Sequence, residues 1–398
     1  MHHAPARIRE DVPLENALGR VLAEDIHANR DLPPYDISAM DGFALRSADL
    51  GGGQAALAVI GDIKAGDHPT LTVGPGQCAR IMTGAPIPAG ADAVIRVEDS
   101  QVLDDGKIAF SISVKPGNDI RQRGEAMRDG TTVLFAGTEI TPGVVGVLAT
   151  VKCASVAVYR RPSVAILSTG DELEALEAPL DPLKIPESNS YAVMAQLQTL
   201  GLEPVRLGIA TDDPEDLAAH LRRGLDYDIL LVSGGSSVGA HDHVRPTLEA
   251  LDVNIHFWRV AIKPGHPLVF GTRGTTQVFG LPGNPVSSMV CVEEFVIPLV
   301  RHLTGHHHCF RETLAARLTH AVKHAPGRSE FIRVSLSPSA DGGWQATSTG
   351  SQSSGDLSSM ANADGLLVVP AESTGLAAGE TVWVQRISTL RFQGKPLP

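Results

Sequence analysis

Aromatic residues are scarce in this chain, and it has neither excess positive charge nor a long hydrophobic run. Phenylalanine, tryptophan and tyrosine make up 4% of its 398 residues, which disfavours a stacking surface for single-stranded nucleic acid. The formal net charge of −12 also argues against nucleic acid as a partner. Because no run reaches about 18 apolar residues, we expect no membrane span and no membrane partner.

Cysteine is equally rare. Cys78, Cys153, Cys291 and Cys309 form no C-x-x-C pair and no disulfide framework, so we expect a reducing compartment. The N-terminal residues contain no apolar signal core. These absences predict a cytoplasmic protein. The 43% hydrophobic and 20% charged residues are typical of a soluble globular chain, long enough for about two to four domains.

The middle of the chain alternates short apolar runs with helical patterns. Asp213, followed by proline and two acids, is typical of a helix N-terminus. The alternation predicts a mostly parallel α/β sheet, in which ligands bind beyond the carboxyl ends of the strands. We expect strands at 163–167, 205–209, 228–232 and 277–280, and helices at 189–200, 213–225, 244–251 and 285–303.

The flanking segments have a different composition. Residues 51–120 and 315–398 are rich in glycine, proline, serine and short β-type runs, which predicts small all-β modules. Three histidines and a cysteine at 306–309 follow the α/β part. They could ligate a metal, but we expect an exposed linker there.

The most informative motif is Ser-Gly-Gly-Ser-Ser-Val-Gly-Ala-His-Asp at 233–242, directly after an expected strand. Its glycines let backbone N–H groups approach phosphate oxygens closely. Asp242 could then hold Mg²⁺ against those phosphates. The alternatives are a tight strand-to-helix turn and a helix cap at Asp242.

Three further glycine-bearing loops follow strand-like segments, at 168–170, 264–265 and 283–284. We expect all four loops to converge on one crevice. Asp171 and Glu172, after the first of them, either ligate a metal, orient a nucleophile or suit a helix N-terminus.

Lys263 stands in the loop Ile-Lys-Pro-Gly-His-Pro. The prolines of this loop restrict its backbone, so the ammonium group is expected to be held in place. The alternative is an ordinary surface lysine. His266 in the same loop either titrates near an anion or is simply a turn residue.

Together, six motifs resemble the MoeA family, the molybdopterin molybdenumtransferases of molybdenum cofactor synthesis, and the matching domain of gephyrin. They occur in the family's order between residues 38 and 287, and the segment 348–355 also resembles the family's C-terminal barrel. The motifs are SAMDGFAL, RIMTGAPIPAGADAVI, LSTGDEL, SGGSSVGAHD, AIKPGHP and GLPGNPVS.

The resemblance implies a four-part architecture in an elongated homodimer. The α/β part would be similar to the molybdopterin adenylyltransferases, and the site would lie between the α/β domain of one subunit and the lid of the other. The implied parts are a discontinuous linker domain (1–35 and 121–159), a β-rich lid (36–120), an α/β molybdopterin-binding domain (160–309) and a C-terminal β-barrel (310–398).

The implied reaction converts adenylylated molybdopterin and molybdate to molybdenum cofactor and AMP, with Mg²⁺. Candidate protein partners are the adenylyltransferase and cofactor-accepting enzymes. One alternative is the adenylyltransferase itself, which needs only the α/β domain, so the chain's length argues against it. Another is a non-catalytic scaffold or binding module, which would tolerate loss of site residues that are mostly present here.

Carried over residue by residue, the resemblance implies three groups of site residues. The catalytic group is Asp41, Thr83, Glu172, Asp212 and Lys263. The substrate-binding group is Ser168, Thr169, Gly170, Gly234, Gly235, Ser236, Pro264, Gly283, Asn284 and Pro285. The Mg²⁺ ligands are Asp242 and Glu172.

The chain also departs from the family pattern. Ala126 stands where the family has an acid, His266 where it has a second lysine, and Arg259 where it has another lysine. The helix expected before Val12 is largely missing. A specialised paralogue is therefore a further alternative.

Overall fold

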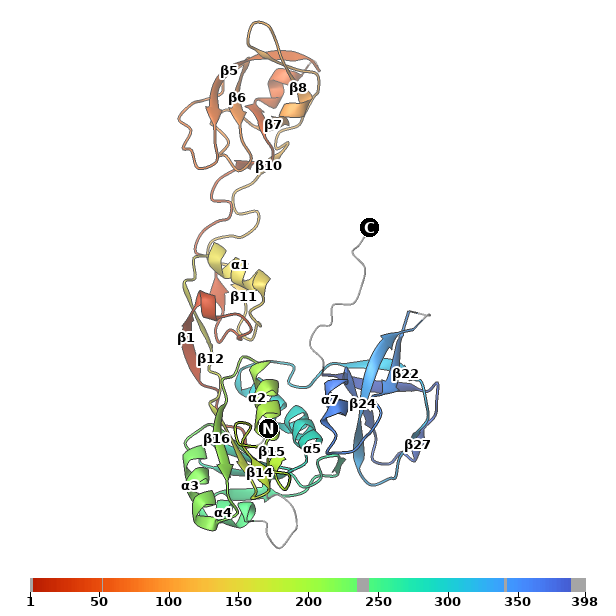
Figure 1. Ribbon diagram of the computed structural model, residues 1–398. Helices are drawn as coiled ribbons and strands as arrows, with labels where there is room; N and C mark the ends of the chain where they lie inside the picture. Colours follow the sequence, from red (N-terminus) through yellow and green to blue (C-terminus); the bar gives the residue numbers. More distant parts are fainter. Residues whose placement is uncertain (1–2, 52, 235–242, 340–341, 388–398) are drawn as a thin grey trace.

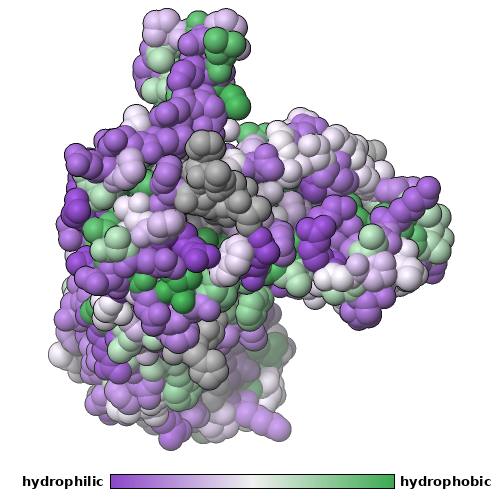
Figure 2. Space-filling model, turned by 90° about the horizontal axis from the view of Figure 1, so that it is seen from below, coloured by the Kyte–Doolittle hydropathy of each residue, from purple (hydrophilic) through white to green (hydrophobic). Residues whose placement is uncertain are grey.

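The computed structural model describes residues 3–51, 53–234, 243–339 and 342–387. Figure 1 shows an elongated molecule, with a small β-rich unit at one end, a narrow neck, and an α/β unit at the other end beside a β-barrel. The face shown in Figure 2 is mainly hydrophilic, with hydrophobic residues in small groups. Within the described ranges, no helix is long and apolar enough to cross a membrane.

A six-stranded sheet of order β16-β13-β17-β21-β20-β18 forms the α/β unit. The prediction of a mostly parallel sheet is confirmed, but the hairpin of β20 and β21 around Gly274 was not expected. Parallel strands are β13 (Val164–Thr169), β16 (Val205–Ala210), β17 (Ile229–Ser233) and β21 (Thr276–Leu281). Antiparallel strands are β20 (Val269–Arg273) and β18 (Asn254–Phe257).

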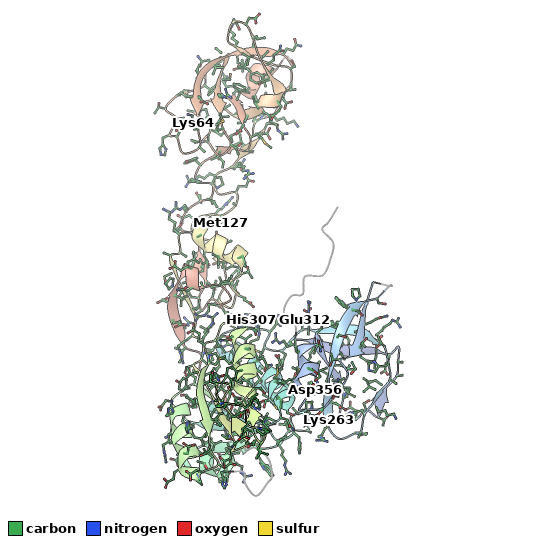
Figure 3. All side chains as sticks on the ribbon, in the orientation of Figure 1. Lys64, Met127, Lys263, His307, Glu312 and Asp356 are labelled. Atoms are coloured by element: carbon green, nitrogen blue, oxygen red, sulfur yellow. The ribbon has the colours of Figure 1, made fainter. Side chains whose placement is uncertain are left out.

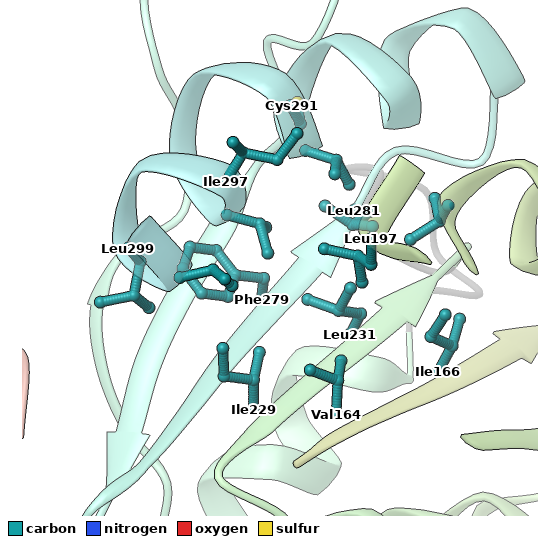
Figure 4. Close-up of a cluster of buried hydrophobic side chains, with 14 of the residues drawn as sticks. Val164, Ile166, Leu197, Ile229, Leu231, Phe279, Leu281, Cys291, Ile297 and Leu299 are labelled. Carbon is teal, nitrogen blue, oxygen red and sulfur yellow. The ribbon is translucent and has the colours of Figure 1, made fainter. Parts of the chain in front are cut away.

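The helices of the α/β unit lie where helical patterns predicted them. The Asp213 side chain accepts hydrogen bonds from the N–H groups of Glu215 and Asp216, as a helix cap does. Figure 4 shows apolar side chains such as Ile166, Leu197 and Phe279 packed in the core between sheet and helices. The helices are α2 (Asn189–Gln198), α3 (Pro214–Gly224), α4 (Val244–Ala250), α5 (Pro285–Cys291) and α6 (Ile297–Leu303).

The predicted continuous helix at 285–303 is wrong in one respect, because a π-helical turn at Val292–Val296 interrupts it. Glu294, in this turn, lines an apolar hollow, and burial raises its pKa to about 7. The folded protein then binds this proton more tightly than the unfolded chain. Stability is therefore expected to fall as pH rises from the unfolded value of 4.5 towards 7.

Glu294→Gln is expected to remove this pH-dependent loss. At about pH 8 the variant should be more stable than the wild type by on the order of 1–3 kcal/mol, and at about pH 5 the two should be similar. Thermal melting at both pH values measures the difference, with the exposed Glu312→Gln as control. A wild-type–variant difference that does not change with pH would mean that Glu294 ionises normally.

The C-terminal part is a closed five-stranded barrel, so the all-β prediction is confirmed there apart from the short helix α7 (Leu357–Ala361). The ring closes because β24 pairs with both β25 and β26. Its strands are β22 (Thr313–Leu318), β24 (Ser329–Pro338), β25 (Trp344–Ser348), β26 (Gly365–Val369) and β28 (Thr381–Arg386).

The α/β unit adds one short strand to this barrel. β19 (Ile262–Lys263) pairs in parallel with β24. The expectation that the 264–265 loop leaves a strand of the α/β sheet is therefore wrong. A two-residue strand carries no periodicity, so sequence reasoning could not assign it to the other sheet.

The all-β prediction for residues 51–120 is also confirmed. A six-stranded sheet of order β7-β4-β6-β5-β9-β8 forms the unit at the far end of the molecule, which we call the lid. Below it, β1 (Arg9–Pro13) pairs with β12 (Ser155–Tyr159) beside α1 (Pro142–Thr150). The lid strands are β4 (Gly42–Leu45), β5 (Ala55–Ile63), β6 (Gln77–Ile81), β7 (Ala93–Arg96), β8 (Ser100–Val102) and β9 (Ile108–Phe110).

The four cysteines are free thiols. Among the described residues, no group of three histidine, cysteine, aspartate or glutamate side chains could hold a metal ion. The expectation of an exposed linker at 306–309 is wrong for His306, whose side chain is 10% exposed. Its Nε2 lies 3.7 Å from Oε2 of Glu139, a residue just before α1. The segment therefore forms part of the contact between the α/β unit and the part of the chain that contains α1.

Candidate functional site

A cleft of about 640 Å³ opens at the carboxyl ends of the parallel strands. Its walls come from the loops after β13, β17 and β21, from Pro267, and from Gly355 and Leu357 of the C-terminal part. The predicted convergence therefore holds directly for the loops at Gly234 and at 283–284. The loops at 168–170 and 264–265 reach the cleft only through residues that follow them, Glu172 and Leu173 in the first case and Pro267 in the second. The lining residues among those predicted from the sequence are Glu172, Gly234, Gly283, Asn284 and Pro285.

Gly234 makes the closest backbone approach in this cleft. Its φ is +101°, and a Cβ atom on it would lie 2.4 Å from the Thr169 carbonyl oxygen. Gly283 is also close, since its own Cβ position would be 3.8 Å from the Gly234 Cα. Only glycine fits at position 234. Gly235, Ser236 and Asp242 lie outside the described residues, so their predicted roles stay predictions.

Buried and half-buried polar side chains connect these loops through hydrogen bonds. Ser168, 1% exposed, donates from its hydroxyl to Glu187 Oε1 at 2.9 Å. Glu187, 4% exposed, also accepts from the Ser190 N–H at 2.7 Å. The Asn189 side-chain amide donates to Ser233 Oγ and the Gly283 carbonyl, both at 2.7 Å. These bonds tie the ends of β13, β17 and β21 to the start of α2.

Glu187 and Asn189 also line the cleft, but neither was predicted from the sequence as a site residue. Their segment, Pro-Glu-Ser-Asn at 186–189, has the composition of a helix start. That interpretation accounted for both residues, so their hydrogen bonds to the loops of the cleft were not anticipated. The signal that could have revealed them is a carboxylate and an amide directly before a helix that packs on the strand ends.

Glu172 is an exposed carboxylate at the rim of the cleft. The helix-start alternative for Asp171 and Glu172 is wrong, because the short strand β14 (Leu173–Glu174) follows them. Asp171 Oδ1 accepts a hydrogen bond of 3.1 Å from the Asp212 N–H. Asp212 therefore contacts the loop that carries Glu172 without lining the cleft.

Lys263 lies at the junction of the α/β unit and the barrel (Figure 3). Its side chain is 54% exposed, and Nζ lies 2.8 Å from Glu330 Oε1. It does not line the cleft. The His266 ring forms a hydrogen bond of 2.7 Å with the Val260 carbonyl, which matches the turn-residue alternative.

Asp41 and Thr83 meet in the lid, beside a separate hollow of about 480 Å³. Asp41 Oδ1 accepts hydrogen bonds from the Thr83 N–H at 2.6 Å and from its hydroxyl at 2.7 Å. These bonds lower the pKa of Asp41, with a smaller contribution from Arg80. Because the lid and the α/β unit are at opposite ends (Figure 1), one chain does not bring Asp41 to Glu172.

A parallel sheet with a loop-built cleft at its carboxyl ends, flanked by a barrel and a distant lid, defines a multidomain α/β ligand-binding protein. Models of known families match it along its length. Residues 1–151 match the MoeA N-terminal region (domain I and II), residues 165–302 a probable molybdopterin binding domain, and residues 315–387 the MoeA C-terminal region (domain IV).

Whole-chain relatives agree with these matches. The molybdopterin molybdenumtransferase of Nostoc sp. is 36% identical over 95% of this chain and 88% of the relative, and that of Haemophilus influenzae is 36% identical over 96% and 94%. The crystal structure of the molybdopterin biosynthesis moea protein from Pyrococcus horikosii superposes with a TM-score of 0.83 at 31% identity, covering 98% of this chain and 97% of that one. The chain belongs to the MoeA family.

Proposed function

We propose that this protein is a molybdopterin molybdenumtransferase, which inserts molybdate into adenylylated molybdopterin and releases AMP during molybdenum cofactor biosynthesis. The observation that carries the proposal is the cleft around Gly234, where backbone and polar groups from three strand ends converge. The identity of about a third to relatives of that name, over nearly the whole chain, supports the substrate assignment.

Each group of residues has a distinct task in this proposal. Gly234 and Gly283, with Gly235 and Ser236, bring the backbone close to the pterin-side phosphate, as glycine loops do at strand ends. Ser168, through Glu187, and Asn189 hold that loop cluster rigid. Lys263 supplies positive charge for molybdate or for charge that develops in the transition state. Asp212 supports the loop of Glu172 through its bond to Asp171.

The cleft is suited to Mg²⁺ held mainly by its substrate. Mg²⁺ typically binds one or two carboxylates and completes its shell with phosphates and water. The rim carboxylate of Glu172 would supply one such ligand, and Asp242 would supply the second. When bound, the ion would offset phosphate charge and make AMP a better leaving group.

The position of the lid supports a site shared between two subunits. Two hydrogen bonds from Thr83 lower the pKa of Asp41 and so favour its charged form. The lid hollow and the cleft are far apart in one chain, so a homodimer in which the lid of one subunit faces the cleft of the other would unite them. In this proposal the chain has four parts. They are a discontinuous linker domain (1–35 and 121–159), the lid (36–120), the α/β domain (160–309) and the barrel (310–398).

We also propose a cellular location and protein partners for this enzyme. A cytoplasmic location fits four free thiols. The adenylyltransferase that supplies the substrate and the enzymes that receive the cofactor are the proposed partners. The departures at Ala126, Arg259 and His266 leave the cleft lining untouched, so we favour an active enzyme over a scaffold.

The test is an AMP-release assay with purified protein, adenylylated molybdopterin, Mg²⁺ and molybdate. We expect release that requires molybdate and that a chelator of divalent cations suppresses. A parallel reaction with molybdopterin and ATP should give no adenylylated product, which separates this enzyme from the adenylyltransferase. Absence of molybdate-dependent release above background would refute the proposal.

A further inference from the structure

Lys263 is held by the barrel rather than by its own domain. It is the direct register partner of Glu330 in the pairing of β19 with β24, and its ammonium group lies 2.8 Å from Glu330 Oε1. The lysine side chain is 54% exposed, whereas that of Glu330 is 9% exposed. The carboxylate is therefore the fixed member of the pair. An ammonium group has three N–H donors, so others stay available to an anion.

His324 holds the second oxygen of the same carboxylate. Its Nδ1 lies 2.8 Å from Glu330 Oε2, and its side chain is 2% exposed. Because a carboxylate oxygen accepts, the proton of this hydrogen bond belongs to Nδ1. Nε2 of this ring is buried and has no hydrogen-bond partner among the described residues. Burial acts to raise the pKa of Glu330, but the bonds from Lys263 and His324 lower it below its usual value.

The geometry differs from that of an ordinary surface ion pair. Exposed pairs contribute little, because two long side chains must be ordered in water. Here the carboxylate is buried, it accepts from two sides, and its strand is paired with that of the lysine. A free lysine side chain populates many rotamers, and Glu330 removes part of that freedom in advance.

We propose that Glu330 is a positioning residue for Lys263, and that His324 fixes Glu330 in turn. The C-terminal barrel would then influence how the enzyme uses molybdate. It would do so through Glu330 of β24, which does not line the cleft but holds the ammonium group of Lys263. This inference rests on the proposed function for the role of Lys263, but the pairing itself can be tested without catalysis.

The catalytic test is a double-mutant cycle on molybdate-dependent AMP release. Glu330→Ala is expected to lower kcat/KM for molybdate about tenfold, with little change in KM for the pterin substrate, and to add nothing in a Lys263→Ala background. Glu312→Ala, an exposed carboxylate of the barrel away from Lys263 in Figure 3, should have no effect. Losses that multiply in the double variant would overturn the inference.

A second pair of variants guards against misfolding of Glu330→Ala. His324→Asn keeps an N–H donor near the Nδ1 position and should retain activity within about threefold of the wild type. His324→Leu removes that donor and should lower kcat/KM for molybdate in the same direction as Glu330→Ala. Equal activity of the two histidine variants would remove His324 from the account.

The third readout is independent of activity. Covalent labelling of the Lys263 amine, followed by mass spectrometry of its peptide, is expected to become several-fold faster in Glu330→Ala, because the nitrogen is then no longer held against the Glu330 carboxylate. Lys64 of the lid serves as internal reference (Figure 3). An unchanged labelling rate would overturn the inference. An inactive wild type with faster labelling in the variant would refute only the proposed function.

Discussion

Alanine in place of Gly234 is expected to abolish molybdate-dependent AMP release, with a loss of at least about 100-fold. The new Cβ would lie 2.4 Å from the Thr169 carbonyl oxygen, so β13 and β17 would have to separate where their loops form the cleft. The positive φ of +101° adds strain, and together the two effects should destabilise the α/β unit by about 2–4 kcal/mol. Activity and thermal melting measure the two consequences separately.

Gly208→Ala is the matched control for backbone strain. Gly208 has a φ of +99° in β16, which pairs with β13 on the side away from β17. No atom of the described residues lies within 4 Å of its Cβ position. This variant should lose about 1–2 kcal/mol of stability and keep most of its activity. If Gly234→Ala were as active as Gly208→Ala, the close approach of the strand ends would have no part in shaping the site.

Mixing two inactive variants is expected to restore activity if the site is shared between subunits. Asp41→Ala damages only the lid, and Glu172→Ala damages only the cleft, so each alone should lose about 100-fold or more. A dimer that contains one subunit of each kind has one site with both residues intact. After subunit exchange, activity should reach about a quarter of the wild-type value.

The control mixture combines two lid variants. Thr83→Ala damages the same lid that Asp41→Ala does, since Thr83 is the hydrogen-bond partner of Asp41. A mixture of these two variants should restore no activity, because every site lacks an intact lid. Failure of the Asp41→Ala and Glu172→Ala mixture to recover, with subunit exchange verified, would refute the shared site.

The elements of the α/β unit could be predicted because their signals are local. Asp213 and the residues after it specify a capped helix without help from elsewhere in the chain. The apolar strand before Gly234 is buried on both faces, as a central parallel strand is. By contrast, the assignment of β19 to the barrel and the π-helical turn at Val292–Val296 depend on packing between distant segments.

In the candidate site, too, features encoded by neighbouring residues could be predicted, whereas contacts between distant segments could not. The glycine loops after strands predicted the cleft, because a phosphate site of this kind is formed by consecutive residues and can be recognised in a short stretch of sequence. Glu187 and Glu330 were not foreseen, since each acts on a residue brought near by the fold: Ser168 in one case, Lys263 in the other. The distance between Asp41 and Glu172 in one chain was likewise a property of the whole molecule.

The central claim is that molybdenum insertion and AMP release are two parts of one reaction. The most direct measurement is a single-turnover reaction in which both products are quantified, molybdenum bound to the pterin and AMP in solution. The account predicts equal amounts of the two, and neither product when molybdate is left out. AMP release without molybdate, or AMP release that leaves no molybdenum on the pterin, would contradict it.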